Sequence, residues 1–352
     1  MIIQESKNAW TKIVLREDNL IKTAIEKLNF HKQKIILVVS NNKKLVGTIT
    51  DGDIRRGFIK GLTIKNKLKQ VKNTKYLFVN SKASSDQARQ LMIDNDIKNL
   101  PIIDKKKNIK GLYSFVTNLP NHNENIPFVI MAGGKGSRLK PITNNCPKPL
   151  IKINKKPILE HIIIKARNEG FKNFFITLNY LGHKIEKYFS DGKKWNVKIK
   201  YIKENYPLGT AGSLNLIKKY LKTNFIVVNG DILTSVNFSD LLDFHLKNKA
   251  TATMTVKTHE IQHPYGVVNT EGMEIKNLQE KPIIKEYVNI GVYAFHPIAL
   301  KSLKKSGYFD MPNVFSWLKK KKKKIIIFPL HETWVDLGIK KELKKIQKNF
   351  EF

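Results

Sequence analysis

The sequence predicts an α/β protein in two parts, a small repeated N-terminal part and a larger part built on a mostly parallel sheet. Over residues 1–118, a pattern of helix, strand, charged turn and strand occurs twice. From residue 127 onward, short apolar runs alternate with helical patterns, as in parallel sheets. The intervening residues 119–126 are polar, contain a proline and lack periodicity, which indicates a linker.

Composition fits a chain of this kind. A length of 352 residues suggests about two domains, and 41% hydrophobic residues suffice for their cores. No apolar run reaches the ~18 residues of a membrane span, and the N-terminus lacks the pattern of a secretory signal. The single cysteine, Cys146, cannot form an internal disulfide. We therefore expect a reducing, cytoplasmic location.

The formal net charge of +35 raises the question of an acidic partner such as nucleic acid. Lysine supplies nearly all of this charge and is spread along the whole chain, together with abundant isoleucine and asparagine. Nucleic-acid readers favour arginine, because its planar group makes bidentate contacts. The composition therefore favours solvated lysine-rich faces over a specific nucleic-acid surface.

Each copy of the N-terminal repeat predicts one helix and two strands. In the first copy, we expect Asp18 to cap a helix, followed by strands at 35–39 and 45–49 around a turn at 41–42. In the second copy, we expect Ser84 to cap a helix, followed by strands at 100–103 and 109–115. The apolar faces of the two helices are Ile21, Ala24, Ile25 and Leu28 in the first, and Ala88, Leu91 and Met92 in the second.

The two copies share one register, in which Gly47, Thr50 and Asp53 match Gly111, Ser114 and Thr117. This repeat resembles a tandem pair of CBS domains, a module that often binds adenine nucleotides. The resemblance implies AMP or ATP as the ligand, with Thr50 on phosphate, Asp53 on the ribose hydroxyls, and Ser114 as the counterpart of Thr50. Thr117 stands where the second carboxylate is expected, so the second site is expected to be weak or empty. A purely structural, dimer-forming pair is the alternative.

The second part predicts strands and helices in alternation. Strands are expected at 174–178, 197–202 and 225–228, and a helix from Pro157 to about residue 168 that stops at Gly170. Further helices are expected at 182–189 and 212–220. The lysine run at 319–324 is expected to form an exposed turn between a helix and a strand at 325–328.

A glycine-rich loop at residues 131–149, MAGGKGSRLKPITNNCPKP, follows the apolar run 128–130. Glycines after a strand let backbone N–H groups approach an anion, and Arg138 and Lys148 can neutralise it. The order of residues excludes a P-loop, and Leu139 stands where a dinucleotide fingerprint needs its third glycine. The loop therefore predicts a cradle for a nucleoside triphosphate.

The loop as a whole resembles the signature of the sugar-1-phosphate nucleotidyltransferases, which implies a Rossmann-like, GT-A-like catalytic domain over residues 127–352. Five further segments resemble family segments in the same chain order: 179–182, 208–212, 265–267, 280–282 and 288–291. Two acids complete the pattern, because Asp231 follows the strand at 225–228 and Asp336 lies in an aromatic-flanked turn. Since ligands sit at the carboxyl ends of parallel strands, the glycine loop and Asp231 are expected on the same rim.

The resemblance implies a role for each matching residue. Arg138 stabilises charge on the triphosphate, Lys148 lies near the α-phosphate, and Asp231 and Asp336 hold Mg²⁺, a hard cation suited to carboxylates. No general base is needed, because the attacking phosphate is already an anion. The implied nucleotide-binding residues are Ala132, Gly133, Gly134, Gly136, Asn179, Gly209 and Thr210. The implied sugar-phosphate-binding residues are Gly266, Glu280, Lys281 and Asn289, with Lys281 placing the attacking phosphate.

The implied reaction joins a sugar 1-phosphate to a nucleoside triphosphate and releases pyrophosphate. A CBS pair ahead of this fold resembles the guanylyltransferases that supply GDP-activated amino sugars for legionaminic-type nonulosonic acids of surface glycans. GTP and an aminohexose 1-phosphate are therefore the expected substrates, in an expected homo-oligomer. A mannose-1-phosphate guanylyltransferase or a UTP- or dTTP-dependent enzyme is the alternative. A non-catalytic protein of this fold is a second alternative, although Arg138, Lys148, Asp231 and Asp336 are all present.

Overall fold

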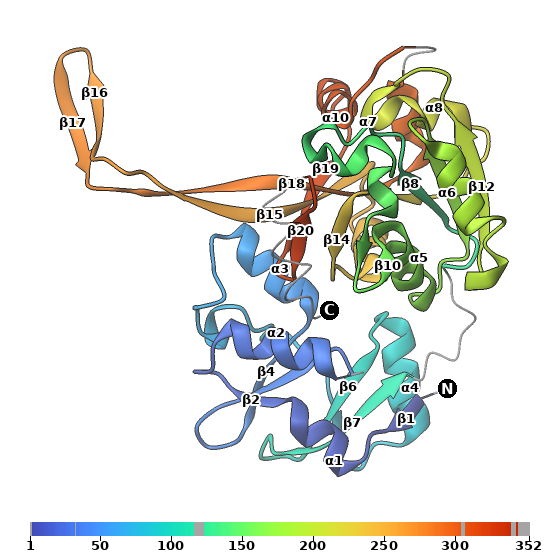
Figure 1. Cartoon of the computed structure of the whole chain (residues 1–352). Coiled ribbons are helices and arrows are strands. Elements are labelled where there is room, and N and C mark those ends of the chain that lie inside the picture. The colour runs from blue at the N-terminus through green and yellow to red at the C-terminus, as the bar shows by residue number, and fades with distance from the viewer. Residues whose placement is uncertain (1, 32, 116–122, 304–306, 339–342, 344–352) are drawn as a thin grey trace. The chain divides into compact units, whose positions relative to one another are not determined.

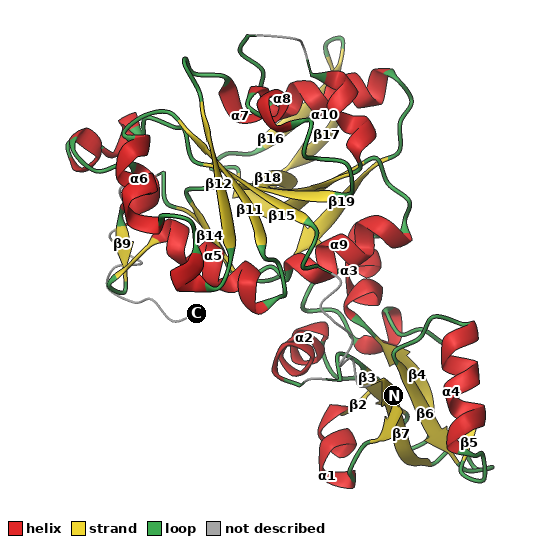
Figure 2. Cartoon of the chain, turned by 90° about the vertical axis from the view of Figure 1, so that its right-hand side faces the viewer, coloured by secondary structure: helices red, strands yellow, loops and turns green. Residues whose placement is uncertain are grey.

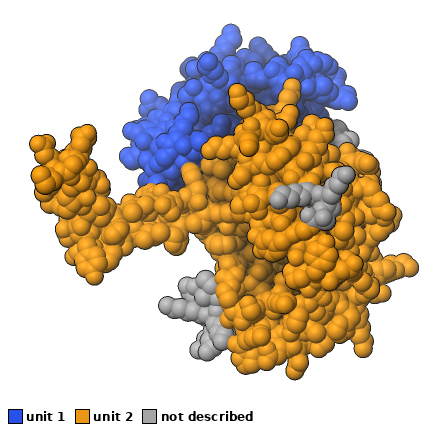
Figure 3. Space-filling view, turned by 90° about the horizontal axis from the view of Figure 1, so that it is seen from above, with its two compact units in different colours: residues 1–120 blue, residues 121–352 orange. Residues whose placement is uncertain are grey.

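The computed structural model describes residues 2–31, 33–115, 123–303, 307–338 and 343. The chain divides into two compact units, residues 1–120 and 121–352, which Figure 3 colours separately. Part of the predicted linker, 119–122, lies outside the described residues. Asn123 follows it and belongs to the second unit, where its side-chain amide donates to the main-chain oxygen of Glu169 at 2.9 Å. No helix in the described ranges is long and apolar enough to cross a membrane.

The N-terminal unit contains two small sheets that confirm the internal repeat (Figure 1). In each copy, one parallel pair of strands is followed by one antiparallel pair. The antiparallel pairs match in detail: Val38 faces Gly47 and Ile102 faces Gly111, and each pairing is followed by a register shift. The first sheet has the order β2 (Val14–Arg16), β3 (Ile36–Val39), β4 (Leu45–Ile49), and the second has β1 (Ile2–Gln4), β7 (Ile109–Phe115), β6 (Asn99–Ile103), β5 (Val79–Asn80).

Helices of this unit are α1 (Lys7–Trp10), α2 (Ile21–Phe30), α3 (Asp51–Ile59) and α4 (Ser85–Asp94), with 3₁₀ turns η1 (Thr11–Ile13) and η2 (Leu68–Gln70). The expected apolar face of α2 is buried, and Ser84 caps α4 by accepting from the N–H of Gln87 at 3.2 Å. The cap predicted at Asp18 is wrong, because Leu20 occupies that position. Main-chain oxygens of residues 64 and 66 accept the first N–H groups of α2 instead, so no side-chain cap is needed.

The second unit is built on a seven-stranded sheet in which β18 alone runs antiparallel to the other six strands (Figure 2). The predicted mostly parallel sheet is thereby confirmed. Its strand order is β12 (Lys198–Lys203), β11 (Asn173–Leu178), β8 (Pro127–Met131), β13 (Phe225–Asn229), β18 (Ile283–Phe295), β15 (Ala252–Gln262), β19 (Ile325–Leu330).

Alternate residues of the central strands point into two separate cores. On β8, Phe128 and Ile130 belong to one core and Val129 to the other. The first core is covered by α5 (Ile158–Asn168), α6 (Gly182–Phe189) and α9 (Phe238–Lys247), and the second by α7 (Gly209–Gly212), α8 (Leu214–Ile217) and α10 (Met311–Lys320). Burial on both faces explains the continuous apolar runs of β8 and β13.

The helix predicted at 212–220 is wrong as a single element. The structure has two short helices instead, α7 and α8, separated at Ser213. The N–H groups of Ala211 and Gly212 both donate to the main-chain oxygen of Phe309, at 2.9 and 3.0 Å, rather than within a helix. The long-range partner competes with local helix formation, which periodicity alone cannot reveal.

Short elements complete the second unit. They are the 3₁₀ turns η3 (Ser137–Leu139), η4 (Ile142–Asn144), η5 (Lys148–Leu150), η6 (Lys193–Trp195) and η7 (Pro297–Ser302), and the strand pairs β9 (Lys152–Ile153) with β10 (Lys156–Pro157), β14 (Ile232–Thr234) with β20 (Trp334–Asp336), and β16 (Val267–Glu271) with β17 (Glu274–Gln279). The lysine run at 319–324 ends α10 and turns exposed into β19, as predicted.

One feature of the second unit was not predicted. Strands β15 and β18 continue past the buried sheet and lead to the β16–β17 hairpin, which projects from the unit (Figure 1). We call residues 257–287 the arm. Its strands are almost entirely exposed, whereas most of β15 before residue 257 is buried.

Candidate active site

The glycine loop and Asp231 leave the sheet at the same edge. Strands β8 and β13 are parallel neighbours, and Met131 faces Asn229 in register. The N–H of Gly230 donates to the main-chain oxygen of Met131 at 2.8 Å and ties the two strand ends together. The chain passes from β8 to β11 and β12 on one side and then crosses to β13 on the other. Such a switch point leaves a crevice at the carboxyl ends of the strands.

Two cations and two carboxylates meet beyond this edge. The ammonium group of Lys148 lies 2.5 Å from Asp231 Oδ2 and 3.7 Å from Asp336 Oδ1. A methyl group built on Gly338 would come within 2.8 Å of Asp336 Oδ1 and 3.1 Å of both Lys148 Nζ and Arg138 Nη2. The structure therefore brings together all four residues for which the sequence predicts catalytic roles. We call these four residues the charged cluster.

Local backbone structure positions the cations of the charged cluster. Gly136 has a φ of +61°, a left-handed conformation that favours glycine, and it precedes the 3₁₀ turn that carries Arg138. A Cβ on Gly136 would lie 3.2 Å from the Cβ of Lys148, so the loop is closely packed there. Thr143 donates its hydroxyl to the Gly136 oxygen at 2.9 Å and holds the loop closed. Lys148 itself is only 5% exposed, so its charge acts in a poorly solvated environment.

Asp336 reaches the cluster because β20 pairs with β14. Ile232, directly after Asp231, faces Asp336 in this antiparallel pair. Asp336 Oδ1 also accepts the N–H of Gly338 at 2.7 Å, which fixes the carboxylate in a tight turn. Trp334 anchors the strand by donating its indole N–H to the main-chain oxygen of Ile290 at 3.1 Å.

The carboxylates fit a divalent cation. Among the described residues, Asp231 Oδ1 and Asp336 Oδ2 have no hydrogen-bond or ion-pair partner. Both side chains are about one-third exposed, so a hydrated ion can reach them. Two carboxylates with free oxygens at an open edge suit Mg²⁺, which retains several waters when bound.

A second group of predicted residues gathers around Glu204, directly after β12. A Cβ on Gly133 would lie 3.0 Å from Glu204 Oε1 and 3.3 Å from the Asn179 Cβ. Asn179 donates its amide to the Glu204 main-chain oxygen at 3.1 Å, and the Leu208 N–H donates to Glu204 Oε2 at 3.3 Å. Burial raises the pKa of the Glu204 carboxyl, opposed by hydrogen bonds from Leu208, Thr177 and Ser213. Glu204 therefore links the glycine loop to the loop at 208–212.

Thr210 and Gly209 are held by Asp310, the cap of α10. Asp310 Oδ1 accepts the Thr210 N–H at 2.9 Å and the Thr210 hydroxyl at 3.1 Å. Gly209 has a φ of +78°, and a Cβ there would meet Asp310 Oδ1 and the Phe309 oxygen, both at 2.8 Å. Burial works to raise the pKa of the Asp310 carboxyl, but hydrogen bonds from Thr210 and Tyr308 outweigh it and lower the pKa.

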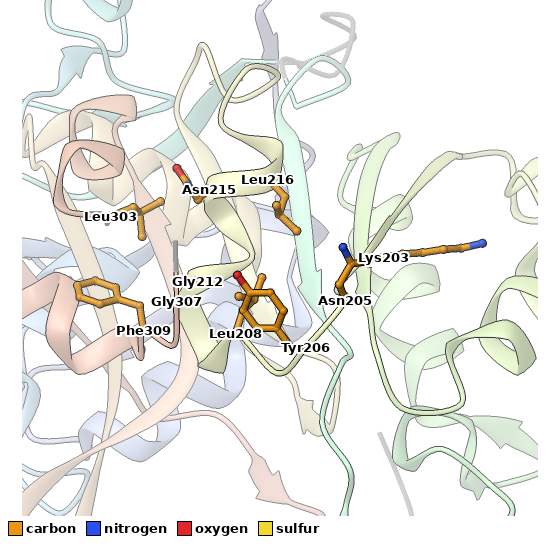
Figure 4. Close-up of a pocket in the computed structure, with 10 residues that line it drawn as sticks. All are labelled: Lys203, Asn205, Tyr206, Leu208, Gly212, Asn215, Leu216, Leu303, Gly307 and Phe309. Carbon is orange, nitrogen blue, oxygen red and sulfur yellow. The ribbon is translucent and has the colours of Figure 1, made fainter. Parts of the chain in front are cut away.

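A pocket of about 130 Å³ lies beside this loop (Figure 4). Its lining includes Leu208 and Gly212 of the loop and Tyr206 before it. Phe309, which precedes the Asp310 anchor, lines the pocket as well. The loop predicted to bind the nucleoside therefore borders an open space.

The sugar-phosphate residues predicted from the sequence do not gather in one place. Asn289 lies at the base of the arm, where its Oδ1 accepts the Gly291 N–H at 3.0 Å, and Gly291 abuts Asn229 at the end of β13. Gly266, Glu280 and Lys281 lie in the arm, where a Cβ on Gly266 would be 3.0 Å from Glu280 Oε2. No hydrogen bond or ion pair within the described ranges joins these three residues to the charged cluster.

The predicted regulatory residues of the N-terminal unit are engaged locally. Asp53 Oδ2 accepts the N–H and the hydroxyl of Thr50 at 2.8 and 2.7 Å, and Asp53 Oδ1 pairs with Arg56 at 2.5 Å. This arrangement starts α3 as a capping box. Ser114 is buried and donates its hydroxyl to Asn99 Oδ1 at 2.9 Å. Thr117 lies outside the described residues.

Sequence reasoning missed three residues that shape the site. Glu204 had a usable signal, because it follows a predicted strand just as Asp231 does. Gly338 stands two residues after Asp336 in a tight turn, a common place for a glycine forced by close approach. Asp310 lies 100 residues from Thr210, and nothing in the local pattern predicts that contact.

Family models match both units. A model described as nucleotidyl transferase matches residues 128–351, and the CBS domain model matches residues 10–60. The second match covers the first copy of the repeat, so a CBS domain in the second copy remains a prediction from the shared register.

Curated relatives are similar over the second unit. The UTP–glucose-1-phosphate uridylyltransferase of a Synechocystis strain is 31% identical over 230 residues, which cover 60% of this chain and 59% of that protein. The catalytic subunit beta of mannose-1-phosphate guanylyltransferase from Drosophila melanogaster is 32% identical over 221 residues, covering 61% of this chain and 60% of that protein. The chain thus spans about three fifths of the length of these relatives.

Solved structures share the fold of the second unit. A glucose-1-phosphate thymidylyltransferase-like protein from Bacillus anthracis superposes with a TM-score of 0.53 at 22% identity, covering 64% of this chain and 98% of that one. HddC from Yersinia pseudotuberculosis superposes with a TM-score of 0.51 at 24% identity, covering 63% of this chain and 98% of that one. These likenesses concern the fold.

Proposed function

Because the chain belongs to the nucleotidyl transferase family and carries an N-terminal CBS domain, we propose that it joins a sugar 1-phosphate to a nucleoside triphosphate. The charged cluster carries this proposal. Phosphoryl-type transfers need alignment and charge neutralisation more than covalent help. Two cations and two carboxylates at the carboxyl ends of β8 and β13 supply both requirements.

In the proposed reaction, a phosphate oxygen of the sugar 1-phosphate attacks the α-phosphorus of the nucleotide. The bond between the α-phosphorus and its bridging oxygen breaks, and pyrophosphate leaves with the bonding electrons. No proton is transferred, because the nucleophile is already an anion. Lys148 stabilises the charge that develops at the α-phosphate, and Arg138 stabilises the departing pyrophosphate. Asp231 and Asp336 would hold Mg²⁺, which would add charge neutralisation on the triphosphate.

We propose GTP as the nucleotide. Glu204 lies beside Gly133 and the loop at 208–212, where the nucleoside is expected. The Glu204 carboxylate accepts hydrogen bonds from Leu208, Thr177 and Ser213, and guanine would have to replace part of this network. Guanine offers a carboxylate two N–H groups side by side on its Watson–Crick edge, whereas uracil and thymine offer a single N–H. The relatives include both a guanylyltransferase and a uridylyltransferase, so Glu204 is the distinguishing observation.

We propose an aminohexose 1-phosphate as the sugar substrate. The support is the order of domains, because a CBS module ahead of this fold resembles the transferases that make GDP-amino sugars for legionaminic-type surface glycans. Mannose 1-phosphate with GTP and glucose 1-phosphate with UTP or dTTP are the alternatives. The sugar side of the site includes Asn289 at the rim and the residues of the arm.

A matrix assay tests the proposal. Each of the four common nucleoside triphosphates is combined with a panel of hexose 1-phosphates, and pyrophosphate release is measured. GTP is expected to be the best nucleotide, and Glu204→Gln is expected to reduce the preference for GTP over UTP at least 10-fold. The matched control is Glu26→Gln, a largely exposed residue of α2 in the other unit, which should leave the preference unchanged. No release by a folded protein with any pair would favour the non-catalytic alternative.

We further propose that the N-terminal unit binds AMP or ATP near Thr50 and Asp53. The Arg56 guanidinium pairs with the Asp53 carboxylate, so ribose hydroxyls would have to displace it. Ligand at ~100 times its dissociation constant should stabilise the fold by about 2.7 kcal/mol. The test compares the AMP-induced melting shift of the native chain with that of Asp53→Ala. Equal AMP-induced melting shifts in the two proteins would show that AMP does not bind at Asp53.

A further inference from the structure

The hairpin at the end of the arm has one apolar face and one polar face. In the β16–β17 hairpin, Val268 faces Leu278 and Thr270 faces Ile275, while Asn269 and Asn277 lie between these pairs on the opposite face. A register shift between Asn269 and Thr270 gives β17 one extra residue. This shift places Ile275 and Leu278 on the same side, although they are three residues apart.

The apolar face is largely exposed within the described part of the chain. Leu278 and Ile275 are 65% and 69% exposed, and Val268 is 47% exposed. A two-stranded hairpin by itself is marginally stable in water and needs a surface to pack against. An exposed, one-sided apolar face on a projecting hairpin is typical of an interaction site.

The arm also carries three of the four residues that are expected to bind the sugar phosphate. Gly266 and Glu280 lie side by side, and Lys281 Nζ is 3.9 Å from Glu280 Oε1. Lys281 has a φ of +44°, a left-handed backbone conformation that is unusual for residues other than glycine, asparagine and aspartate. The nucleotide half of the site, the charged cluster, lies at the sheet edge. In this structure the two halves have no described contact with each other.

The base of the arm is held straight by its own strand pairing. Strands β15 and β18 pair without irregularity from Val256↔Asn289 to Gln262↔Ile283, a run of about 20 Å. The His263 N–H then donates to the Pro282 oxygen at 3.0 Å and extends the ladder. Folding the arm back onto the sheet edge of its own chain would break this ladder. A surface of another molecule is therefore the simpler partner for the arm.

The charge of the arm permits a second copy of this chain as that surface. The arm contains five carboxylate residues and four lysines, a balance of −1, whereas the whole chain has a formal net charge of +35. A nearly neutral arm can therefore approach a second, strongly basic copy with little charge repulsion.

We propose that the arm of one copy packs over the sheet edge of a second copy and brings Glu280 and Lys281 to the partner's nucleotide site. The active form is then a dimer with reciprocally exchanged arms, and each site combines the charged cluster of one chain with the arm of the other. In such a symmetric exchange, the same contact between arm and sheet edge is made twice and completes both active sites. This inference rests on the proposed nucleotidyl transfer.

The first test measures molar mass by light scattering. The native chain is expected to be a dimer, and Leu278→Asp is expected to shift it to monomer. Asn277→Asp adds the same charge one residue away on the polar face and is expected to remain dimeric. A native chain that is monomeric at the assay concentration and fully active, or a Leu278→Asp variant that stays dimeric, would overturn the proposal.

The second test is complementation between two inactive chains. Asp231→Asn removes the cluster's carboxylate and Lys281→Ala removes the arm's cation, and each variant alone is expected to be inactive. The two chains are co-expressed with different tags and the heterodimer is purified. One of its two sites then combines an intact cluster with an intact arm, so half the native turnover per dimer is expected.

Turnover at the background of the single variants would show that each arm serves its own chain. A Lys281→Ala chain with native activity would also overturn the inference, since the arm would then contribute nothing to the site. Failure of the proposed function is distinguishable from both, because the native chain would release no pyrophosphate before any mixing.

Discussion

Gly338→Ala inserts one methyl group into the charged cluster. Gly338 is not in the left-handed region of backbone conformation, so alanine is compatible with its backbone. The new Cβ would lie 2.8 Å from Asp336 Oδ1 and 3.1 Å from Arg138 Nη2 and Lys148 Nζ. Ordinary contacts of this type are longer than 3.0 Å, so the carboxylate and both cations must move by several tenths of an ångström.

Displacement of this size affects the reaction far more than the fold. Misplacing reacting groups by about 1 Å can reduce rates by about 100-fold, and disturbing one preorganised electrostatic group has a similar effect. We therefore expect turnover to fall by about 100-fold, or about 2.7 kcal/mol in activation free energy. The cluster is partly exposed at the sheet edge, so the melting temperature should change by only a few degrees.

The assay is pyrophosphate release under saturating nucleotide, sugar 1-phosphate and magnesium. The control is Gly52→Ala, which adds the same methyl group in helix α3, where the nearest atom is the flexible Arg56 Nη1 at 3.3 Å. Gly52→Ala should retain native turnover. Native turnover in folded Gly338→Ala would refute the assignment of the charged cluster to the reacting phosphates.

Three further predictions follow from other contacts. Asp231→Asn should lower turnover at least ~100-fold at saturating magnesium, while Asp191→Asn in an exposed turn should not; equal rates for both would remove Asp231 from the reaction. Asp310→Ala should raise the nucleotide KM about 10-fold with little change in kcat, because Thr210 loses its anchor; an unchanged KM would contradict that role. Burial, reinforced by the nearby His296, lowers the pKa of His245 to about 4, so its neutral form stabilises the fold above pH 6.5 and this stability is lost as pH falls toward 4. Urea titrations should show a loss of order 3 kcal/mol in that window, and His245→Asn should show a flatter profile; parallel profiles would argue against a neutral, buried His245.

Much of the architecture could be predicted because local patterns and tertiary packing agree. The helix from Pro157 ends at Asn168 as expected, and the strand at 109–115 has the predicted bounds. A glycine loop and an acid that each follow a parallel strand are also predicted to lie at one edge of the sheet, because the carboxyl ends of parallel strands lie at the same edge. The meeting of Lys148 with Asp231 follows from that rule, whereas Asp336 reaches the cluster through the pairing of β20 with β14.

Other features depend on contacts that are distant in sequence. Residues 64–66 replace a side-chain cap at the start of α2, and Phe309 interrupts the helix expected at 212–220. Neither partner has a signature in the local pattern. The arm was missed for a different reason, because strands β15 and β18 look like ordinary sheet strands and nothing in their composition shows where the sheet ends.

The account depends most directly on whether a nucleotidyl group is transferred to the sugar 1-phosphate at the charged cluster. The measurement is a ³¹P NMR time course of the protein with GTP, magnesium and an aminohexose 1-phosphate, in parallel with Asp231→Asn. We predict nucleotide-sugar and pyrophosphate signals that grow in equal amounts with the native chain and remain at background with the variant. Equal growth in both samples, or release of inorganic phosphate without a nucleotide-sugar, would contradict the account.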